Sequence, residues 1–206
     1  MVLINILLVD DHVLFAKSLS VALDEYNEIE HFHVAGDIQS LDEMILDKNI
    51  DIVLMDINLG NLSDGDGLEI ASDILKSNPG VKIIILTGYD LPVYRHEARK
   101  KGISGFLNKN ISPDNLISSL IHVSRGNTCF PPESSEIIIE DLTNTEKKIL
   151  QLISSGKKRK HVADELYMSE RTISNHLQHI FEKLGVSSAV EAVTKAIQLG
   201  YIPPIC

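Results

Sequence analysis

Short apolar runs alternate with longer segments of helical period along the first 125 residues of this 206-residue chain. Each run holds four to six residues, and most runs are rich in Ile, Val and Leu. Strands that are apolar on both faces and separated by helices are typical of a parallel sheet covered on both sides. We therefore predict an α/β domain with a doubly wound, five-stranded parallel sheet. The predicted strands span residues 4–9, 32–35, 52–55, 82–86 and 104–107.

The end of this domain is marked by helix signals. Ser112 can cap a helix, Pro113 suits its first position, and the segment runs to Arg125 before Gly126. The next fifteen residues carry adjacent prolines, two serines and four acids, which is typical of a linker, although three isoleucines at 137–139 predict packing near its end. We expect a first domain at 1–126, a linker at 127–141 and a second domain at 142–206.

The second domain is predicted to be a small all-α domain of four helices. Thr143 and Glu146 form a capping box that opens the first helix. A second helix spans about 158–166, and Ser169 caps a third whose apolar residues recur at spacings of four, three and four. Ser188 and Glu191 open the fourth. Two helices joined by a turn at 167–169 form a helix-turn-helix candidate, with a generic four-helix domain as the alternative.

Composition excludes several classes of protein. The chain is 44% hydrophobic and 23% charged, which is ordinary for a globular protein. Its longest apolar runs fall short of the roughly 20 residues that a membrane-spanning helix needs, and the N-terminus lacks the features of a signal peptide. We expect a cytoplasmic protein with no membrane partner.

The formal net charge of −10 is the sum of an acidic N-terminal part and a mildly basic C-terminal part. Residues 1–125 carry a net charge of −9 and residues 126–141 a net charge of −4, whereas residues 142–206 carry +3. Such asymmetry points to separate partners for the two halves. The acidic total therefore does not exclude nucleic acid as a partner of the second domain.

Polar residues follow four of the five predicted strands. Asp10 and Asp11 follow the first, Asp56 the third, Thr87 the fourth and Lys109 the fifth. The carboxyl ends of parallel strands share one edge, so these side chains should converge there. Three carboxylates would repel one another unless a hard cation such as Mg²⁺ lies among them, and a lysine and a hydroxyl suit a phosphoryl group. The pattern favours a site for an aspartyl phosphate over ordinary strand-end turn residues.

The first domain resembles the receiver domain of bacterial two-component response regulators, which has a flavodoxin-like fold. The resemblance covers about residues 4–125. It is carried by four motifs: Leu7-Leu8-Val9-Asp10-Asp11-His12, Asp51-Ile52-Val53-Leu54-Met55-Asp56, Ile84-Ile85-Leu86-Thr87 and Gly105-Phe106-Leu107-Asn108-Lys109.

The resemblance implies a role for each site residue. Asp56 would take a phosphoryl group from the phosphohistidine of a sensor histidine kinase. Asp10, Asp11, Asp56 and the backbone carbonyl of Asn58 would hold Mg²⁺. Lys109 would grip the phosphoryl oxygens, Thr87 would move toward the phosphate, and Phe106 would swing inward with it, although Phe106 can also be read as a plain core residue.

The loop after Asp56 departs from the family pattern. Gly60 stands where the family usually has Pro, and the loop at 58–67 is about three residues longer than usual. These differences put the dynamics of the loop beside Asp56 in question.

Other histidines and cysteines are read as structural. His31 and His33 share one face of a strand, but a metal site needs a third ligand that the sequence does not supply, so we expect solvated or core histidines. Cys129 and Cys206 make neither a disulfide framework nor a zinc spacing.

The second domain resembles the LuxR-type DNA-binding domain over about residues 142–202. The carrying motifs include Leu142-Thr143-x-x-Glu146, Met168-Ser169-Glu170-Arg171-Thr172-Ile173-Ser174-Asn175-His176 and Lys183-Leu184-Gly185-Val186. The resemblance implies that the helix at about 170–184 enters the major groove and that the last helix forms a dimer contact. Base-facing residues would be Ser174, Asn175 and Gln178, and residues nearer the DNA backbone would be Lys158, Lys160, Arg171, Thr172 and His176. Lysines that are common in the family at 174 and 178 are absent.

Together the two domains have the layout of the NarL/FixJ family of response regulators. The expected function is a phosphorylation-controlled transcription regulator that binds promoter DNA as a homodimer, with a sensor kinase, RNA polymerase and Mg²⁺ as further partners. One alternative is DNA binding that is independent of phosphate. Another is a Mg²⁺-dependent phosphohydrolase, but such enzymes commonly carry a second Asp where this chain has Asn58.

Overall fold

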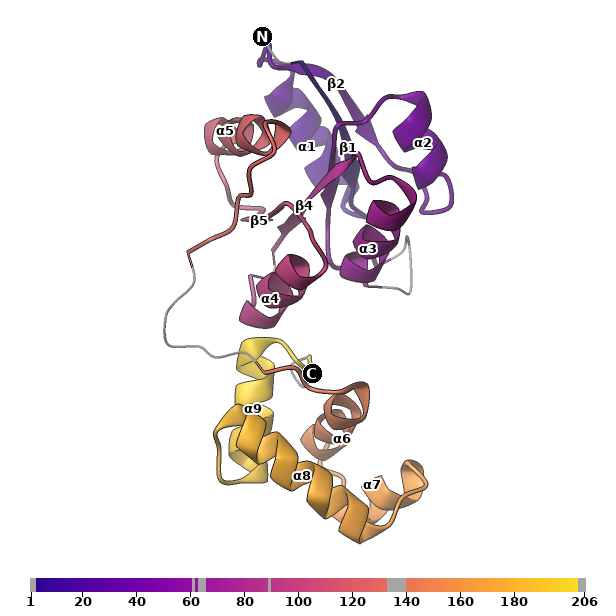
Figure 1. Ribbon diagram of the computed structural model, residues 1–206, viewed down its shortest axis with the longest axis vertical. Coiled ribbons are helices and arrows are strands. Elements are labelled where there is room, and N and C mark those ends of the chain that lie inside the picture. Colours follow the sequence, from indigo (N-terminus) through magenta and orange to yellow (C-terminus); the bar gives the residue numbers. More distant parts are fainter. Residues whose placement is uncertain (1–2, 61, 63–65, 89, 133–139, 204–206) are drawn as a thin grey trace. The chain divides into compact units, whose positions relative to one another are not determined.

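The computed structural model describes residues 3–60, 62, 66–88, 90–132 and 140–203. The chain divides into two compact units, one N-terminal and one C-terminal, and each is described by itself below. Figure 1 shows the α/β unit and the all-helical unit along the chain. No helix within these described ranges is long and apolar enough to cross a membrane.

The N-terminal unit is built on a five-stranded parallel sheet with strand order β2-β1-β3-β4-β5. The predicted fold class is therefore confirmed. The strands are β1 (Ile4–Val9), β2 (Ile29–Val34), β3 (Ile52–Met55), β4 (Lys82–Thr87) and β5 (Gly105–Asn108). Strand β2 begins three residues earlier than predicted. It lies at the sheet edge, where Glu30 and His31 are exposed, so the apolar-run criterion missed its start.

Five helices cover the two faces of this sheet: α1 (Val13–Leu23), α2 (Leu41–Asp47), α3 (Gly67–Ser77), α4 (Pro92–Lys100) and α5 (Pro113–Ser124). Successive strand residues point to opposite faces of the sheet, so each central strand contributes side chains to two apolar cores, one on each face. Leu7 and Val53 pack with residues of α2, α3 and α4, whereas Ile6 and Leu54 pack with residues of α1 and α5. Because both faces are covered, the carboxyl edge of the sheet is where polar chemistry can gather.

The segment after α5 joins the edge of the sheet. Cys129 forms a parallel bridge with Gly105, and the backbone amide of Phe106 donates to the Cys129 carbonyl at 2.8 Å. The Phe130 ring packs against the core and lies 4.2 Å beneath the guanidinium of Arg99. Residues expected to begin the linker are thus part of the N-terminal unit, and the isoleucines at 137–139 lie outside the described residues.

The C-terminal unit consists of α6 (Asn144–Ser154), α7 (Arg159–Glu165), α8 (Glu170–Leu184) and α9 (Ala189–Leu199). The predicted capping box at Thr143 and Glu146 is present, and Ser169 caps α8 by accepting from the Thr172 amide. One apolar core joins the four helices. Its fully or nearly fully buried members include Ile149, Leu150, Val162, Ala163, Ile173, Leu177, Ile180, Leu184, Ala192 and Ala196.

A buried carboxylate ties α6 to α8 in this unit. The Glu146 carboxylate accepts from the Thr143 amide at 2.8 Å and from Lys183 Nζ at 2.7 Å, and Lys183 also donates to the Asp141 carbonyl. Burial alone would raise the pKa of Glu146, but the hydrogen bonds from Lys183 and Thr143 outweigh burial and lower it. The carboxylate therefore stabilises the unit in its ionised form.

We expect Glu146→Gln to lower the free energy of unfolding of the C-terminal unit by about 2–3 kcal/mol near pH 7. The substitution weakens hydrogen bonds to a charged group and leaves the Lys183 ammonium without its counter-charge. Because the folded pKa of Glu146 lies below its ordinary value of 4.5, its contribution is complete above that pH and is lost as pH falls through the folded pKa.

The loss of unfolding free energy in Glu146→Gln should therefore be smaller in acid than at neutral pH. Urea unfolding of the full chain near pH 7 and near pH 4, followed through the amide signals of α8, measures this difference. Glu191→Gln is the matched control, because Glu191 has the corresponding position in α9 but is exposed. Equal losses in the two variants would contradict the role of burial at Glu146.

Candidate functional site

The carboxyl edge of the sheet brings together four of the residues singled out from the sequence. Asp10 follows β1, Asp56 follows β3, Thr87 ends β4 and Lys109 follows β5. Asp10 is 5% exposed, Asp56 2% and Thr87 0%. Polar side chains buried to this degree need partners, because water cannot solvate them.

Lys109 joins two of the carboxylates. Its Nζ lies 2.6 Å from Asp56 Oδ2 and 2.7 Å from Asp10 Oδ2. Burial lowers the pKa of Lys109, but the hydrogen bonds and charges of Asp10 and Asp56 more than offset it, so the pKa is raised. The ammonium stays charged at neutral pH and lies against a candidate nucleophile.

The acidic group consists of Asp10, Asp11, His12 and Asp56, which can each offer one ligand atom within 4.8 Å of the others. Asp10 Oδ2 and Asp11 Oδ1 are buried, and within the described residues each has one close nitrogen neighbour: Lys109 Nζ lies 2.7 Å from Asp10 Oδ2, and His12 Nδ1 lies 2.8 Å from Asp11 Oδ1. Buried carboxylate oxygens with free acceptor capacity are the donors that a hard divalent cation prefers. This donor set fits Mg²⁺.

The loop after Asp56 approaches this group closely. A Cβ at Gly60, whose φ is +39°, would lie 2.2 Å from Asp11 Oδ2. The Asn58 side chain accepts from the Gly60 amide at 3.3 Å, and Asn58 pairs with Asp66 in an antiparallel bridge. The glycine that replaces the usual proline thus lets the backbone pass directly beside Asp11. Residues 61 and 63–65 of the extended loop lie outside the described residues.

Gly67 is a site residue that sequence reasoning missed. Asp66 caps α3 by accepting from the Leu68 amide, and a Cβ at Gly67 would lie 2.0 Å from the Asp56 backbone oxygen. The start of α3 therefore packs against the backbone that carries Asp56. The sequence shows that Gly67 directly follows the capping residue Asp66, which could have pointed to it. The contact with the Asp56 carbonyl that requires a glycine forms only in the folded chain.

Thr87 and Phe106 lie deeper than the acidic group. Thr87 is fully buried, and its carbonyl accepts from the Lys109 amide at 3.0 Å. Phe106 is fully buried and belongs to the core on the α2–α4 face, while its amide bonds the Cys129 carbonyl. The backbone of β5 therefore connects Lys109 to the segment that leaves the unit.

The candidate DNA-facing residues of α7 and α8 divide by exposure. Lys158, Lys160, Arg171, Asn175 and Gln178 are exposed, whereas Thr172, Ser174 and His176 are half-buried. Lys157 forms an ion pair with Glu165. Gln178 Nε2 donates to Glu182 Oε1 one turn later at 3.1 Å, which orients its amide on the outer face of α8.

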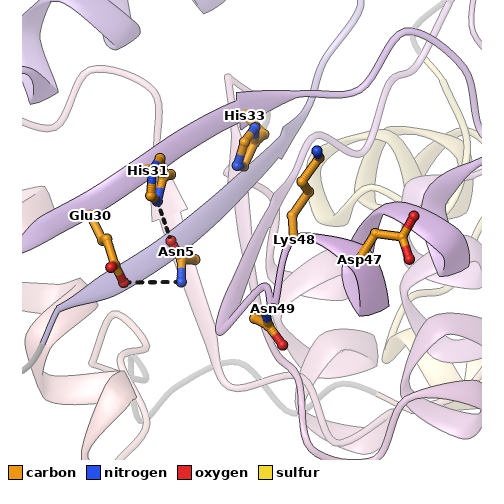
Figure 2. Close-up of a pocket in the computed structure, with 7 residues that line it drawn as sticks. All are labelled: Asn5, Glu30, His31, His33, Asp47, Lys48 and Asn49. Atoms are coloured by element: carbon orange, nitrogen blue, oxygen red, sulfur yellow. Dashed lines mark hydrogen bonds between the residues drawn. The ribbon is translucent and has the colours of Figure 1, made fainter.

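A pocket of about 540 Å³ lies on the other edge of the sheet, where β2 and the start of β1 meet the end of α2. Figure 2 shows its lining, in which His31 Nδ1 donates a hydrogen bond to Asn5 Oδ1 at 3.1 Å. The rings of His31 and His33 stack at 5.9 Å, and burial, with the charges of His31 and Lys48, lowers the pKa of His33. Across the described ranges, the acidic group is the one set of three or more ligands found, so the histidine pair has no third metal ligand.

Two family models match the chain. The model of the response regulator receiver domain matches residues 6–121, and that of the LuxR family of bacterial regulatory proteins matches residues 140–196. The transcriptional regulatory protein DegU of Brevibacillus brevis is 29% identical over 97% of this chain and 95% of its own length. The transcriptional regulatory protein ComA of Bacillus subtilis is 34% identical over 71% of this chain and 74% of its own length.

Solved structures agree with these matches. The response regulator ChrA of a heme-sensing two-component system is 28% identical with a TM-score of 0.54, covering 98% of this chain and all of its own. RcsB dimers bound to DNA give a TM-score of 0.67 at 22% identity, covering 95% of this chain and 98% of theirs, which concerns the fold alone. The predicted family is thus confirmed: the chain belongs to the NarL/FixJ-type response regulators, which join a receiver domain to a LuxR-type DNA-binding domain.

Proposed function

We propose that Asp56 is the phosphoacceptor of this response regulator and that its phosphorylation by a sensor histidine kinase controls promoter binding. The observation that carries the proposal is the arrangement around Asp56. Its Oδ1 accepts from the Ile57 amide at 2.8 Å, its Oδ2 meets Lys109 Nζ at 2.6 Å, and Asp10 and Asp11 lie beside it. The Asp56 carboxylate is thus held in a buried position beside the positive charge of Lys109.

In the proposed transfer, a carboxylate oxygen of Asp56 attacks phosphorus while the bond from phosphorus to the kinase imidazole breaks. The electron pair leaves with the imidazole, which then takes a proton. Lys109 pairs with the charge on the phosphoryl oxygens. Asp10, Asp11, Asp56 and the Asn58 carbonyl would hold Mg²⁺, which supplies charge neutralisation to the phosphoryl group. The chain acts as a phosphoacceptor, with at most self-phosphorylation from small donors and autodephosphorylation.

The proposed switch runs from Thr87 and Phe106 to the end of the receiver domain. Thr87 moves toward the phosphate, Phe106 follows, and the face around α4 and β5 changes. Phe106 is bonded to Cys129 through the backbone, and Phe130 packs under Arg99 of α4, which supports a direct effect on the linker. The outcome is a homodimer on promoter DNA that acts with RNA polymerase.

In the DNA-binding domain, α8 is proposed to enter the major groove. Ser174, Asn175 and Gln178 would face bases, while Lys158, Lys160, Arg171, Thr172 and His176 would lie nearer the phosphates. The support is the exposure of Asn175 and Gln178 on one face of α8 and of the two lysines at the start of α7.

Replacing Asp56 tests the phosphoacceptor. Incubation of Asp56→Asn with Mg²⁺ and acetyl phosphate should give no phosphoryl adduct by intact-protein mass spectrometry, because the amide is not a nucleophile of this kind. The phosphodonor should also fail to raise the DNA affinity of the variant, in contrast to the wild type.

Asp51→Asn is the matched control, since Asp51 precedes the other end of β3, where it accepts from the Asn5 amide. It should still be phosphorylated. An Asp56→Asn protein that gains phosphate would refute the assignment, and a wild type whose DNA affinity ignores phosphorylation would favour phosphate-independent binding.

Gly60→Ala tests the metal site. The new Cβ would displace the Asp11 side chain, so we expect Mg²⁺ affinity to fall about tenfold. The left-handed backbone should also cost about 1 kcal/mol of stability. Both effects can be measured by titrating Mg²⁺ against the melting temperature.

Gly102→Ala separates the two effects. Gly102 also has a positive φ, of +78°, but a Cβ there meets nothing within 4 Å. This variant should lose similar stability and keep its Mg²⁺ affinity. Unchanged Mg²⁺ affinity in Gly60→Ala would contradict Asp11 as a ligand.

Lys160→Ala tests the DNA surface. Loss of one phosphate contact should weaken binding to any duplex and reduce the slope of log affinity against log salt by about 0.9. Lys157→Ala is the control, because Lys157 is paired with Glu165. A similar loss of slope in both variants would argue against a specific contact by Lys160.

A further inference from the structure

Seven helices of the described chain end in the same backbone arrangement. In each case one of the first two residues after the helix has positive φ and donates its amide to the carbonyl three residues before it, and the next amide donates to the carbonyl five residues before itself. This is the Schellman motif, whose left-handed position favours glycine. The residues at that position are Asn49, Gly102, Gly126, Gly156, Tyr167, Gly185 and Gly200.

Tyr167 is the exception in this set. Its φ is +54°, its amide donates to the Asp164 carbonyl at 3.3 Å, and the Met168 amide donates to the Ala163 carbonyl at 2.9 Å. Five of the other positions hold glycine, and Asn49 is the type of polar residue that tolerates this conformation. A tyrosine there strains the backbone at the end of α7.

The Tyr167 side chain does not pack against the core of the C-terminal unit, so no packing offsets the backbone strain. Tyr167 is 98% exposed, whereas its neighbours Leu166 and Met168 pack against the core of the C-terminal unit. A large exposed aromatic held in a strained backbone indicates a use outside the chain. The relevant partner is the one that meets the turn between α7 and α8.

The turn lies at the start of the proposed recognition helix. Tyr167 precedes by two residues Ser169, the N-cap of α8, and Arg171 is exposed in the first turn of that helix. In a helix-turn-helix, the first helix crosses the DNA backbone and the second enters the groove, so the turn passes close to phosphates. Tyrosine hydroxyls and helix N-termini are both common phosphate donors.

We propose that Tyr167 is a DNA-contact residue whose hydroxyl donates a hydrogen bond to a backbone phosphate beside the groove that α8 enters. This inference rests on the proposed DNA-binding role of α7 and α8 and adds a contact that the basic residues do not supply. Because the hydroxyl is neutral, the contact strengthens binding without releasing a counterion. The strain at Tyr167 is then a cost in stability that serves binding.

Two substitutions in the full chain separate strain from contact. Tyr167→Asn introduces the residue type that occupies the equivalent position after α2, Asn49. It should slow hydrogen exchange of the α7 amides about threefold, because asparagine relieves the strain of the left-handed backbone. Tyr167→Phe keeps the strain and should leave exchange unchanged. Both should weaken binding to a short mixed-sequence DNA duplex about tenfold, with the salt slope unchanged. The measurement is made with Mg²⁺ and acetyl phosphate present.

Two controls accompany these variants. Asn49→Tyr places the same side chain at the corresponding position of the receiver domain, and should speed exchange of the α2 amides without changing DNA affinity. Lys160→Ala should lower both affinity and salt slope, which identifies a charged phosphate contact in the same assay.

Each outcome decides the proposal. Slower exchange in Tyr167→Asn with weaker binding in both variants supports it. Unchanged DNA affinity in Tyr167→Phe overturns it, and slower exchange with unchanged affinity in Tyr167→Asn overturns it as well, because the backbone strain then serves no DNA contact. If Asn49→Tyr does not destabilise α2, the strain that motivates the proposal is refuted. A wild type that fails to bind the duplex at low salt refutes the DNA-binding function itself.

Discussion

The ion pairs of Lys109 with Asp10 and Asp56 are the interaction on which the receiver site depends. They join the ends of β1, β3 and β5 and balance carboxylates that are 5% and 2% exposed. Without a cation among them, buried carboxylates this close would be strongly destabilised. The same lysine that neutralises the resting site is proposed to meet the phosphoryl group, so stability and chemistry share one side chain.

The backbone around Asp56 is equally constrained. Gly67 lets the start of α3 pack on the Asp56 carbonyl, and Gly60 lets the loop pass beside Asp11. On the other side, β5 carries Lys109 at one end and bonds Cys129 through Phe106. A shift of β5 therefore displaces both Lys109 and the segment that leaves the receiver domain, because Lys109 directly follows β5 and the Phe106 amide of β5 donates to the Cys129 carbonyl.

The DNA-binding domain separates its inner and outer faces cleanly. Ile173, Leu177 and Ile180 of α8 are buried, and the Glu146–Lys183 pair ties the same helix to α6. The outer face is left to polar residues such as Asn175 and Gln178, with Glu182 orienting the Gln178 amide. With such a scaffold, the residues exposed on the outer face, Tyr167 included, can be substituted without disturbing the core.

The sequence was enough to predict the fold class, the family and the convergence of Asp10, Asp56, Thr87 and Lys109 at one edge of the sheet. Apolar periodicity and strand-end position are local properties, and parallel strands must share an edge. It missed the start of β2, because edge strands expose polar residues. The folded chain was needed to explain why Gly60 and Gly67 are glycines and to place Cys129 on the sheet edge. It also decided that Tyr167 is strained and exposed. These facts depend on atoms that come from distant parts of the chain or from a backbone angle, and neither is encoded in residue spacing.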